Sequence, residues 1–179
     1  MNIGILALQG AVSEHISSIE KNNINAVKVR TPADLQNISG LIMPGGESTT
    51  LRNLLKNSEL WKAISESTLP IMGTCAGAIL IGKCQDETFG KIDMIIDRNY
   101  YGRQKDSFEK DIRIGNNKIF KGVFIRAPAI ISIGNKTKPI AWADDDIVGC
   151  VEGKNMALTF HPELTNDLTF HKLWLEGLK

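Results

Sequence analysis

The stretch "LPIMGTCAGAILIGK", residues 69–83, decides the fold of this chain. It begins as a short apolar run and continues as a helix-forming run, with Gly73, Cys75 and Gly77 at the junction. This pattern predicts a buried strand that turns sharply into a helix, in the form of a nucleophile elbow with a thiol in place of the serine hydroxyl. Glycine is expected on both sides because larger side chains would collide with the neighbouring strand and helix. The alternative for Cys75 is a buried structural cysteine, a common fate of a free thiol.

The first half of the chain repeats this alternation of strand and helix. Strands are expected at residues 3–8, 26–30 and 40–46, and helices within residues 11–22 and 48–67. The expected strands are apolar throughout instead of alternating, which indicates a parallel sheet with helices on both faces. Such sheets keep their chemistry at the carboxyl ends of the strands, where the bend at Cys75 falls.

The second half of the chain has a different pattern. Residues 89–158 form a series of short β-like pieces separated by turns, and residues 166–178 predict a final helix. We therefore predict an α/β fold: a single-domain, doubly wound, mostly parallel sheet over residues 1–179, with helices on both faces and an added β-rich segment.

The composition is that of an ordinary globular domain. A net charge of +1 over 179 residues gives no reason to expect nucleic acid or a membrane surface as a partner. The three cysteines have no C-x-x-C spacing, so neither a disulfide framework nor a zinc site is predicted. The amino-terminal apolar run lacks the basic lead-in of a signal peptide, and no apolar run approaches the roughly 20 residues of a membrane helix. We expect a cytoplasmic protein.

A thiol nucleophile needs a base and a group that orients the base. In "TFHPELT", His161 and Glu163 can supply both, directly after an expected strand. Pro162 favours extended backbone at His161, which would point the two side chains to the same side. The other histidines, His15 and His171, lie in expected helices, where solvent exposure or simple packing is the expected role.

A glycine-rich turn, "PGGES", ends the strand expected at residues 40–46. Gly45 and Gly46 can adopt backbone conformations closed to other residues, so their amides can face an oxyanion. The alternative is an ordinary turn followed by a helix cap. The hydroxyl residues expected to cap the two helices that follow are Ser48, Thr49 or Thr50 for the first and Ser58 for the second.

Three motifs, "PGGES", "GTCAG" and "HPE", in this order and at these separations, resemble class I glutamine amidotransferases. Together with "LALQGAVSEH", "DRNYYGRQKDSFE" and "FIRAPAI", they make the chain similar to one family in particular. That family is the glutaminase subunit of the deoxyxylulose-phosphate-independent pyridoxal 5′-phosphate synthase, and the similarity runs nearly end to end. The segment between Cys84 and Gly90 looks short for the family, so we expect a different local loop there.

The resemblance implies an enzyme that hydrolyses glutamine through a thioester. Cys75 would be the nucleophile, His161 the base and Glu163 the group that orients the base. The backbone amides of Gly46 and Ala76 would hold the oxyanion. The residues implied to lie along bound L-glutamine are Gly46, Glu47, Ser48, Arg98, Ile125 and Arg126. For the two arginines the alternative is an ion pair with a nearby acidic residue.

The resemblance also implies a partner, the (β/α)8-barrel synthase subunit that receives the ammonia. Ammonia released into water is protonated and loses its nucleophilicity, so transfer inside protein is expected. Residues 8–15, "LQGAVSEH", are the implied docking surface. No metal or organic cofactor is needed for this chemistry. We expect weak glutaminase activity from the isolated chain and higher activity with the partner bound.

Three other interpretations remain at the level of the sequence. The first is a glutaminase for another synthase, such as those for imidazole glycerol phosphate or guanine nucleotides, against which "GRQKDSFE" argues. The second is a catalytically silent regulatory or scaffold subunit, against which the intact Cys75, His161 and Glu163 argue. The third is a Cys-elbow hydrolase or chaperone-like protein, which would not require "HPE" after a late strand.

Overall fold

Five parallel strands form the centre of the molecule. The computed structural model describes residues 1–98, 100, 107–115 and 118–179. The central strands, in spatial order, are β2 (Asn25–Val29), β1 (Asn2–Leu6), β3 (Gly40–Met43), β4 (Ile71–Thr74) and β11 (Asn155–Leu158). Each pairs with its neighbours in parallel. All side chains of β3 and β4 are buried, which explains why both strands read as unbroken apolar runs.

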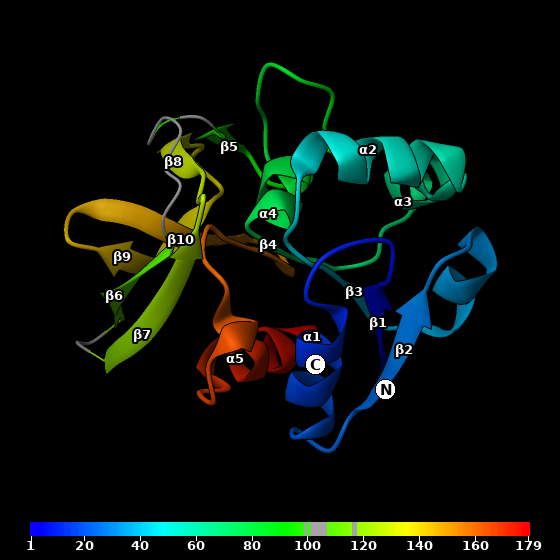
Figure 1. Cartoon of the computed structure of the whole chain (residues 1–179), viewed down its shortest axis with the longest axis horizontal. Helices are drawn as coiled ribbons and strands as arrows, with labels where there is room; N and C mark the ends of the chain where they lie inside the picture. Colours follow the sequence, from blue (N-terminus) through cyan, green and yellow to red (C-terminus); the bar gives the residue numbers. More distant parts are fainter. Residues whose placement is uncertain (99, 101–106, 116–117) are drawn as a thin grey trace.

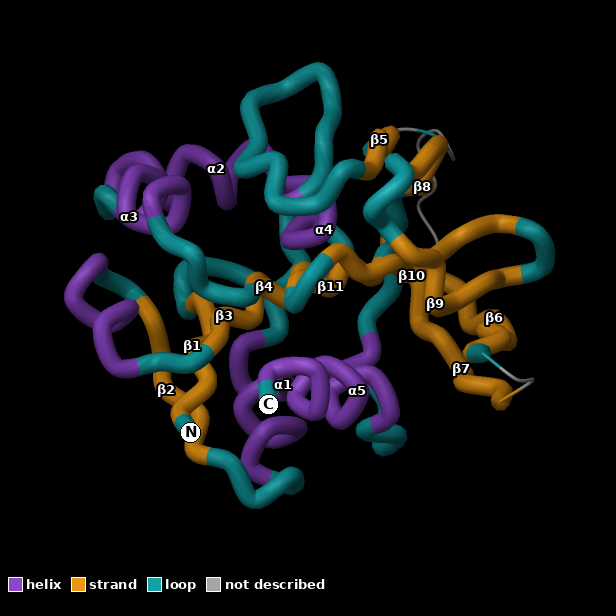
Figure 2. Tube along the Cα trace, turned by 180° about the vertical axis from the view of Figure 1, so that it is seen from behind, coloured by secondary structure: helices purple, strands orange, loops and turns teal. Residues whose placement is uncertain are grey.

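Helices cover both faces of this sheet, as Figures 1 and 2 show from opposite sides. One face carries α1 (Val12–Glu20) and α5 (Thr169–Leu178), and the other carries α2 (Ser48–Asn57), α3 (Leu60–Glu66) and α4 (Ala76–Ile81). The helices of each layer contribute to a separate apolar cluster, in which their buried side chains meet those of the sheet. The doubly wound arrangement predicted from the sequence is therefore confirmed.

The sheet continues beyond β11 as four antiparallel strands. In spatial order these are β10 (Asp146–Glu152), β9 (Lys138–Ala143), β6 (Ser107–Ile114) and β7 (Lys118–Ile125). A separate two-stranded sheet is made of β5 (Met94–Asp97) and β8 (Ala129–Ile133). This is the β-rich segment expected from the second half of the sequence. Two short 3₁₀ turns complete the elements, η1 (Pro32–Asn37) and η2 (Pro162–Leu164).

The helix caps differ from the prediction. The residue that caps α2 is Glu47, whose carboxylate accepts hydrogen bonds from the N–H groups of Thr49 and Thr50 over 3.0 and 2.7 Å. Two carboxylate oxygens satisfy two free helix N–H groups, which one hydroxyl cannot do. Ser58 does not cap α3: it lies at the end of α2, where its hydroxyl donates to the carbonyl of Leu54.

Two predicted features fall outside the described residues. Residues 99 and 101–106 belong to the motif "DRNYYGRQKDSFE", and residues 116 and 117 belong to an expected turn.

Within the described part of the chain, no helix combines the length and the apolar character that crossing a membrane requires.

Candidate active site

Cys75 lies on the bend between β4 and α4. Its φ of 49° is in a region that non-glycine residues rarely occupy, so the surrounding structure must hold the bend. A Cβ added to Gly77 would fall 1.9 Å from the carbonyl oxygen of Met43, and one added to Gly73 would fall 2.6 Å from the main chain of Gly77. The predicted steric need for both glycines is confirmed, because either Cβ would force the strand and the helix apart.

The thiol of Cys75 is buried against the ends of two further strands. The Cys75 N–H donates to the carbonyl of Leu158, the last residue of β11, over 2.8 Å. Its Sγ lies 3.7 Å from the carbonyl oxygen of Ile125, the last residue of β7. The side chain is only slightly exposed, at 5%. A ligand reaching Cys75 therefore meets the main chain around Ile125, one of the residues expected along the glutamine.

His161 and Glu163 come from the loop that follows β11. Because β11 pairs in parallel with β4, the carboxyl ends of the two strands meet, and Leu158 lies opposite Thr74. Nδ1 of His161 is 2.7 Å from Oε1 of Glu163, and both residues are buried. The geometry predicted for this pair was wrong in one respect. The chain does not stay extended beyond His161 but enters the 3₁₀ turn η2, which brings the carboxylate back to the imidazole.

Gly45 lies between His161 and Cys75. A Cβ added to Gly45 would be 2.5 Å from Cε1 of His161 and 3.2 Å from Cβ of Cys75, so both side chains close over the same glycine. Burial by itself would lower the pKa of His161, but hydrogen bonds to Cys75 and Glu163, together with their charges, raise it to about 10. Burial likewise opposes ionisation of Glu163, yet the neighbouring His15 and His161 lower its pKa. The arrangement favours a charged imidazole beside the carboxylate.

The glycine turn, residues 45–47, faces the loop after β1. Gly46 has a φ of 139°, a conformation that strains any residue with a Cβ. The Glu47 N–H donates to Oε1 of Gln9 over 3.2 Å, and the Gln9 side chain fills the space where a Gly46 Cβ would be. Hydrogen bonds from Thr50 and Thr49 outweigh the opposing effect of burial and lower the pKa of Glu47 to about 2.

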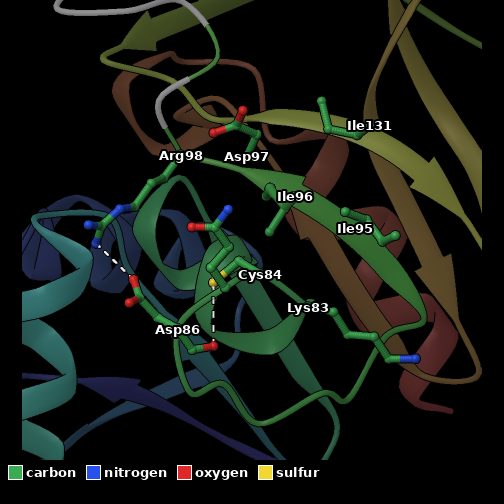
Figure 3. Close-up of a pocket in the computed structure, with 9 residues that line it drawn as sticks. Lys83, Cys84, Asp86, Ile95, Ile96, Asp97, Arg98 and Ile131 are labelled. Atoms are coloured by element: carbon green, nitrogen blue, oxygen red, sulfur yellow. Dashed lines mark hydrogen bonds and ion pairs between the residues drawn. The ribbon is translucent and has the colours of Figure 1, made fainter.

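Arg98 forms the ion pair that was the alternative to a glutamine contact. Its Nη1 is 3.0 Å from Oδ2 of Asp86 and 2.9 Å from Oγ1 of Thr49. Asp86 belongs to the loop between Cys84 and Gly90, the segment that looks short for the family. Arg98 and Asp86 line a cavity of about 720 Å³ between this loop and the β5–β8 sheet (Figure 3). Neither Cys75 nor His161 lines this cavity, so its size does not make it the reaction centre.

The remaining expected site residues lie at three element ends. Ser48 is the first residue of α2 and Ala76 the first of α4, and both are buried. Arg126 follows β7 with an exposed side chain and a positive φ of 45°. The structure thus brings Cys75, His161 and Glu163 together, with the ends of α2, α4 and β7 around them.

Sequence reasoning missed two histidines. His15 and His171 are fully buried, so of the two expected roles, solvent exposure and simple packing, the first was wrong. Nδ1 of His15 is 3.0 Å from Nε2 of His171, and Nε2 of His15 is 3.4 Å from Oε2 of Glu163. A sequence signal existed for His15, which is three residues after Val12 and four before Ile19 and thus shares their inward-facing side of α1.

Comparisons with known proteins agree with this geometry. Residues 5–179 match the SNO glutamine amidotransferase family. The chain is 41% identical to the pyridoxal 5′-phosphate synthase subunit PdxT of Kosmotoga olearia, over 99% of this chain and 98% of the relative. It is 42% identical to the protein of the same name from Pyrococcus furiosus, over 99% of both chains.

A solved structure described as a glutamine amidotransferase superposes on this one with a TM-score of 0.91. It is 36% identical to this chain, and the match covers 98% of each chain. Similarity at this level, over nearly the whole length, includes the elbow, the glycine turn and the loop after β11. The chain belongs to the SNO glutamine amidotransferase family.

Proposed function

We propose that this chain is the glutaminase subunit of a pyridoxal 5′-phosphate synthase. It hydrolyses L-glutamine to L-glutamate and ammonia and passes the ammonia to a synthase subunit. The observation that carries the proposal is a buried cysteine on a strained bend, next to an imidazole whose Nδ1 is 2.7 Å from a carboxylate. The names of the full-length relatives indicate the pathway, the synthesis of pyridoxal 5′-phosphate. One sheet running through the chain suits a single glutaminase domain over residues 1–179.

The proposed reaction begins with transfer of the Cys75 thiol proton to His161 and attack of the sulfur on the side-chain carboxamide of glutamine. The tetrahedral intermediate carries an oxyanion, which the backbone N–H groups of Gly46 and Ala76 stabilise. His161 then gives its proton to the departing ammonia, leaving a glutamyl thioester that water hydrolyses. Glu163 keeps the imidazole oriented and stabilises its charged form, as in other triads of this type.

Glutamine itself is bound through its α-substituents. It differs from asparagine by one methylene, so discrimination depends largely on where those charged groups are held. Arg98 can bind the α-carboxylate in the proposed site, with Asp86 and Thr49 fixing its position. The Glu47 carboxylate is already occupied at the start of α2, which leaves the main chain of residues 46–48 and of residues 125–126 for contacts to the substrate.

The proposed partner is the (β/α)8-barrel synthase subunit, docked on the segment of residues 8–15, in which His15 is buried and takes no part in the surface. Two contacts connect this segment to the glycine turn. The Gln9 side chain accepts a hydrogen bond from Glu47, and Gly10 lies so close to Gly45 that an added Cβ would be 2.1 Å from the Gly45 carbonyl oxygen. A partner that moves this loop therefore moves the glycine turn, and with it one of the oxyanion-binding amides. The cytoplasm is the proposed location of the complex.

The deciding experiment measures ammonia release from glutamine by the purified chain, with the synthase subunit added and withheld. We expect low turnover alone, higher turnover in the complex, and none in Cys75→Ala, whereas Cys84→Ala remains active. Equal turnover with and without the partner would refute activation. Turnover that survives Cys75→Ala would refute the nucleophile.

Two rival functions make different predictions in the same assay. A silent regulatory subunit releases no ammonia under any condition. A glutaminase for another synthase is active but does not bind the pyridoxal 5′-phosphate synthase barrel, and it copurifies with a different enzyme. The 41% and 42% identity to full-length synthase subunits favours the proposed function over both rivals.

A further inference from the structure

The second oxygen of the Glu163 carboxylate has no hydrogen-bond donor of ordinary geometry. Oε2 is buried and accepts no hydrogen bond from the described residues, whereas Oε1 faces His161. Nε2 of His15 lies 3.4 Å from Oε2, and both side chains are completely removed from solvent. A buried carboxylate oxygen without a hydrogen-bond donor lowers the stability of the folded protein. His15 on α1 can reduce this loss because its ring nitrogen interacts electrostatically with the oxygen.

We infer that His15 is a positioning residue of the active site, whose Nε2, 3.4 Å from Oε2 of Glu163, attracts that oxygen electrostatically and keeps Oε1 on His161. This rests on the proposed function in one respect, namely that Glu163 orients the base of the reaction. His15 touches neither substrate nor nucleophile. It acts on the reaction through the Glu163 carboxylate. The row of neighbouring side chains Cys75, His161 and Glu163 thus continues to His15, in the helix layer formed by α1 and α5.

The hydrogen-bond partners determine which nitrogens carry protons. Oγ1 of Thr74 can accept a hydrogen bond from Nε2 of His15, and the negative charge of Glu163 favours a proton on the same nitrogen, so we place the proton of His15 on Nε2. Its Nδ1 is then an acceptor and must receive the Nε2–H of His171, which lies 3.0 Å away. That leaves Nδ1 of His171 without a proton, and this atom is the buried His171 nitrogen without a partner among the described residues. Burying a ring nitrogen that carries no proton and has no partner costs less free energy than burying an N–H group that has no acceptor. The three observations fit one assignment of protons.

The charges around His15 are consistent with a neutral ring. Burial lowers the pKa of His15, and the charge of His161 lowers it further. The charges of Glu163 and of Glu14, which lies on the same helix, act in the opposite direction. Burial also lowers the pKa of His171, the neighbour from α5, to about 3. A neutral His15, held by the neutral His171, can direct its Nε2 dipole at the carboxylate without adding a positive charge that would compete with His161 for it.

His15 also contacts the strand that carries the nucleophile. Its Nε2 is 3.3 Å from Oγ1 of Thr74, the residue before Cys75. One ring nitrogen therefore lies between the end of β4 and Glu163 of η2, at comparable distances from both. The position fixes the two halves of the active site against each other as well as the carboxylate itself.

The test compares His15→Gln with His15→Leu in the complete complex with the synthase subunit. The glutamine side chain can place an N–H near the position of Nε2, whereas leucine supplies no donor. In His15→Leu we expect kcat for ammonia release to fall about 10- to 100-fold, with little change in KM for glutamine. In His15→Gln we expect most of this loss in kcat to be restored. The acid limb of the pH profile should move up by about one pH unit in His15→Leu, because an unpaired carboxylate is protonated more easily.

Ile19→Val is the matched control, since it also removes buried volume from α1 but replaces one apolar side chain, which forms no hydrogen bond or ion pair, by another. It should lower thermal stability while leaving the acid limb in place. An unchanged kcat and an unchanged acid limb in His15→Leu would overturn the inference, as would a His15→Gln variant no better than His15→Leu. Absence of ammonia release by the unmodified complex would instead refute the proposed function.

A measurement on the unmodified chain needs neither turnover nor a stable variant. Nitrogen-15 NMR of the imidazole rings should find His15 and His171 neutral at pH 7, each with its proton on Nε2. A proton on Nδ1 of His15, with Nε2 bare toward Glu163, would overturn the inference even if all variants fail to fold.

Discussion

Gly77 packs against the main chain of Met43 so tightly that a Cβ would lie 1.9 Å from the Met43 carbonyl oxygen. The contact joins the first turn of α4 to the end of β3, directly before the glycine turn. It therefore sets the spacing between the bend that carries Cys75 and the turn that carries Gly46. The positions of both proposed oxyanion-binding amides, those of Gly46 and Ala76, depend on this single close contact between two backbones.

Gly77→Ala should damage the site more than it damages the fold. The added methyl forces α4 away from Met43 and moves Cys75 with it, and a displacement of this kind can cost about 100-fold in rate. Overpacking should cost about 1–3 kcal/mol, or several degrees in melting temperature. Gly177→Ala in α5 is the control, because nothing lies within 4 Å of its Cβ position. Similar ammonia release by the two variants would contradict the steric argument.

Glu163→Gln should lower kcat strongly and change how stability depends on pH. The Glu163 pKa is lowered, so its contribution to stability is present above its ordinary value of 4.5 and is lost as the pH falls through the lower folded value. The His161 pKa is raised, so its contribution is present below 6.5 and is lost as the pH rises through about 10. Denaturant unfolding of both proteins should therefore show the largest stability difference between about pH 4.5 and 6.5. A difference that does not vary with pH would rule out an ionised pair.

Arg98→Gln should raise KM for glutamine about 10- to 100-fold with a smaller effect on kcat, because a charge-assisted bond to the substrate carboxylate is lost. Lys121→Gln removes another cation that pairs with an acid, Asp111 at 2.5 Å, and should leave KM unchanged. Steady-state kinetics in the presence of the synthase subunit separate the two constants. If Arg98→Gln lowers only thermal stability, the arginine serves the ion pair with Asp86 alone.

The three free cysteines should react with different reagents. Burial raises the pKa of Cys150 to about 12, so it stays a thiol at neutral pH and should resist iodoacetamide until the chain unfolds. Cys84 lines the large cavity and should be alkylated in the folded protein (Figure 3). A glutamine-like electrophile such as 6-diazo-5-oxonorleucine should label Cys75 alone, as peptide mass spectrometry can verify. Labelling of Cys84 by that reagent would contradict the selectivity expected of Cys75 as the nucleophile.

Much of the fold could be predicted because it depends on short-range pattern. Buried parallel strands need apolar residues at every position, and β3 and β4 show this directly in the chain. The bend at Cys75 needs glycine at positions 73 and 77 because two backbones meet there, and the sequence displays both. The order of strands and helices along the chain follows from the same signals.

One local detail was predicted wrongly, and contacts between distant segments were missed. Glu47 and not a hydroxyl residue caps α2, because its carboxylate can reach two N–H groups at once. His15 and His171 are 156 positions apart in the chain, and only the packing of α1 beside α5 brings their rings together under Glu163. The partnership of Arg98 with Asp86 depends in the same way on how the loop after α4 folds back.

The sequence by itself determined the α/β architecture, the elbow at Cys75 and the pairing of His161 with Glu163 two residues later, since each follows from local backbone requirements or close spacing. The tertiary structure alone decided how the ends of β4, β7 and β11 surround the thiol, and which buried groups face the second oxygen of Glu163. Those contacts join segments that only the register of the sheet and the packing of its helices bring together, and no local pattern encodes them.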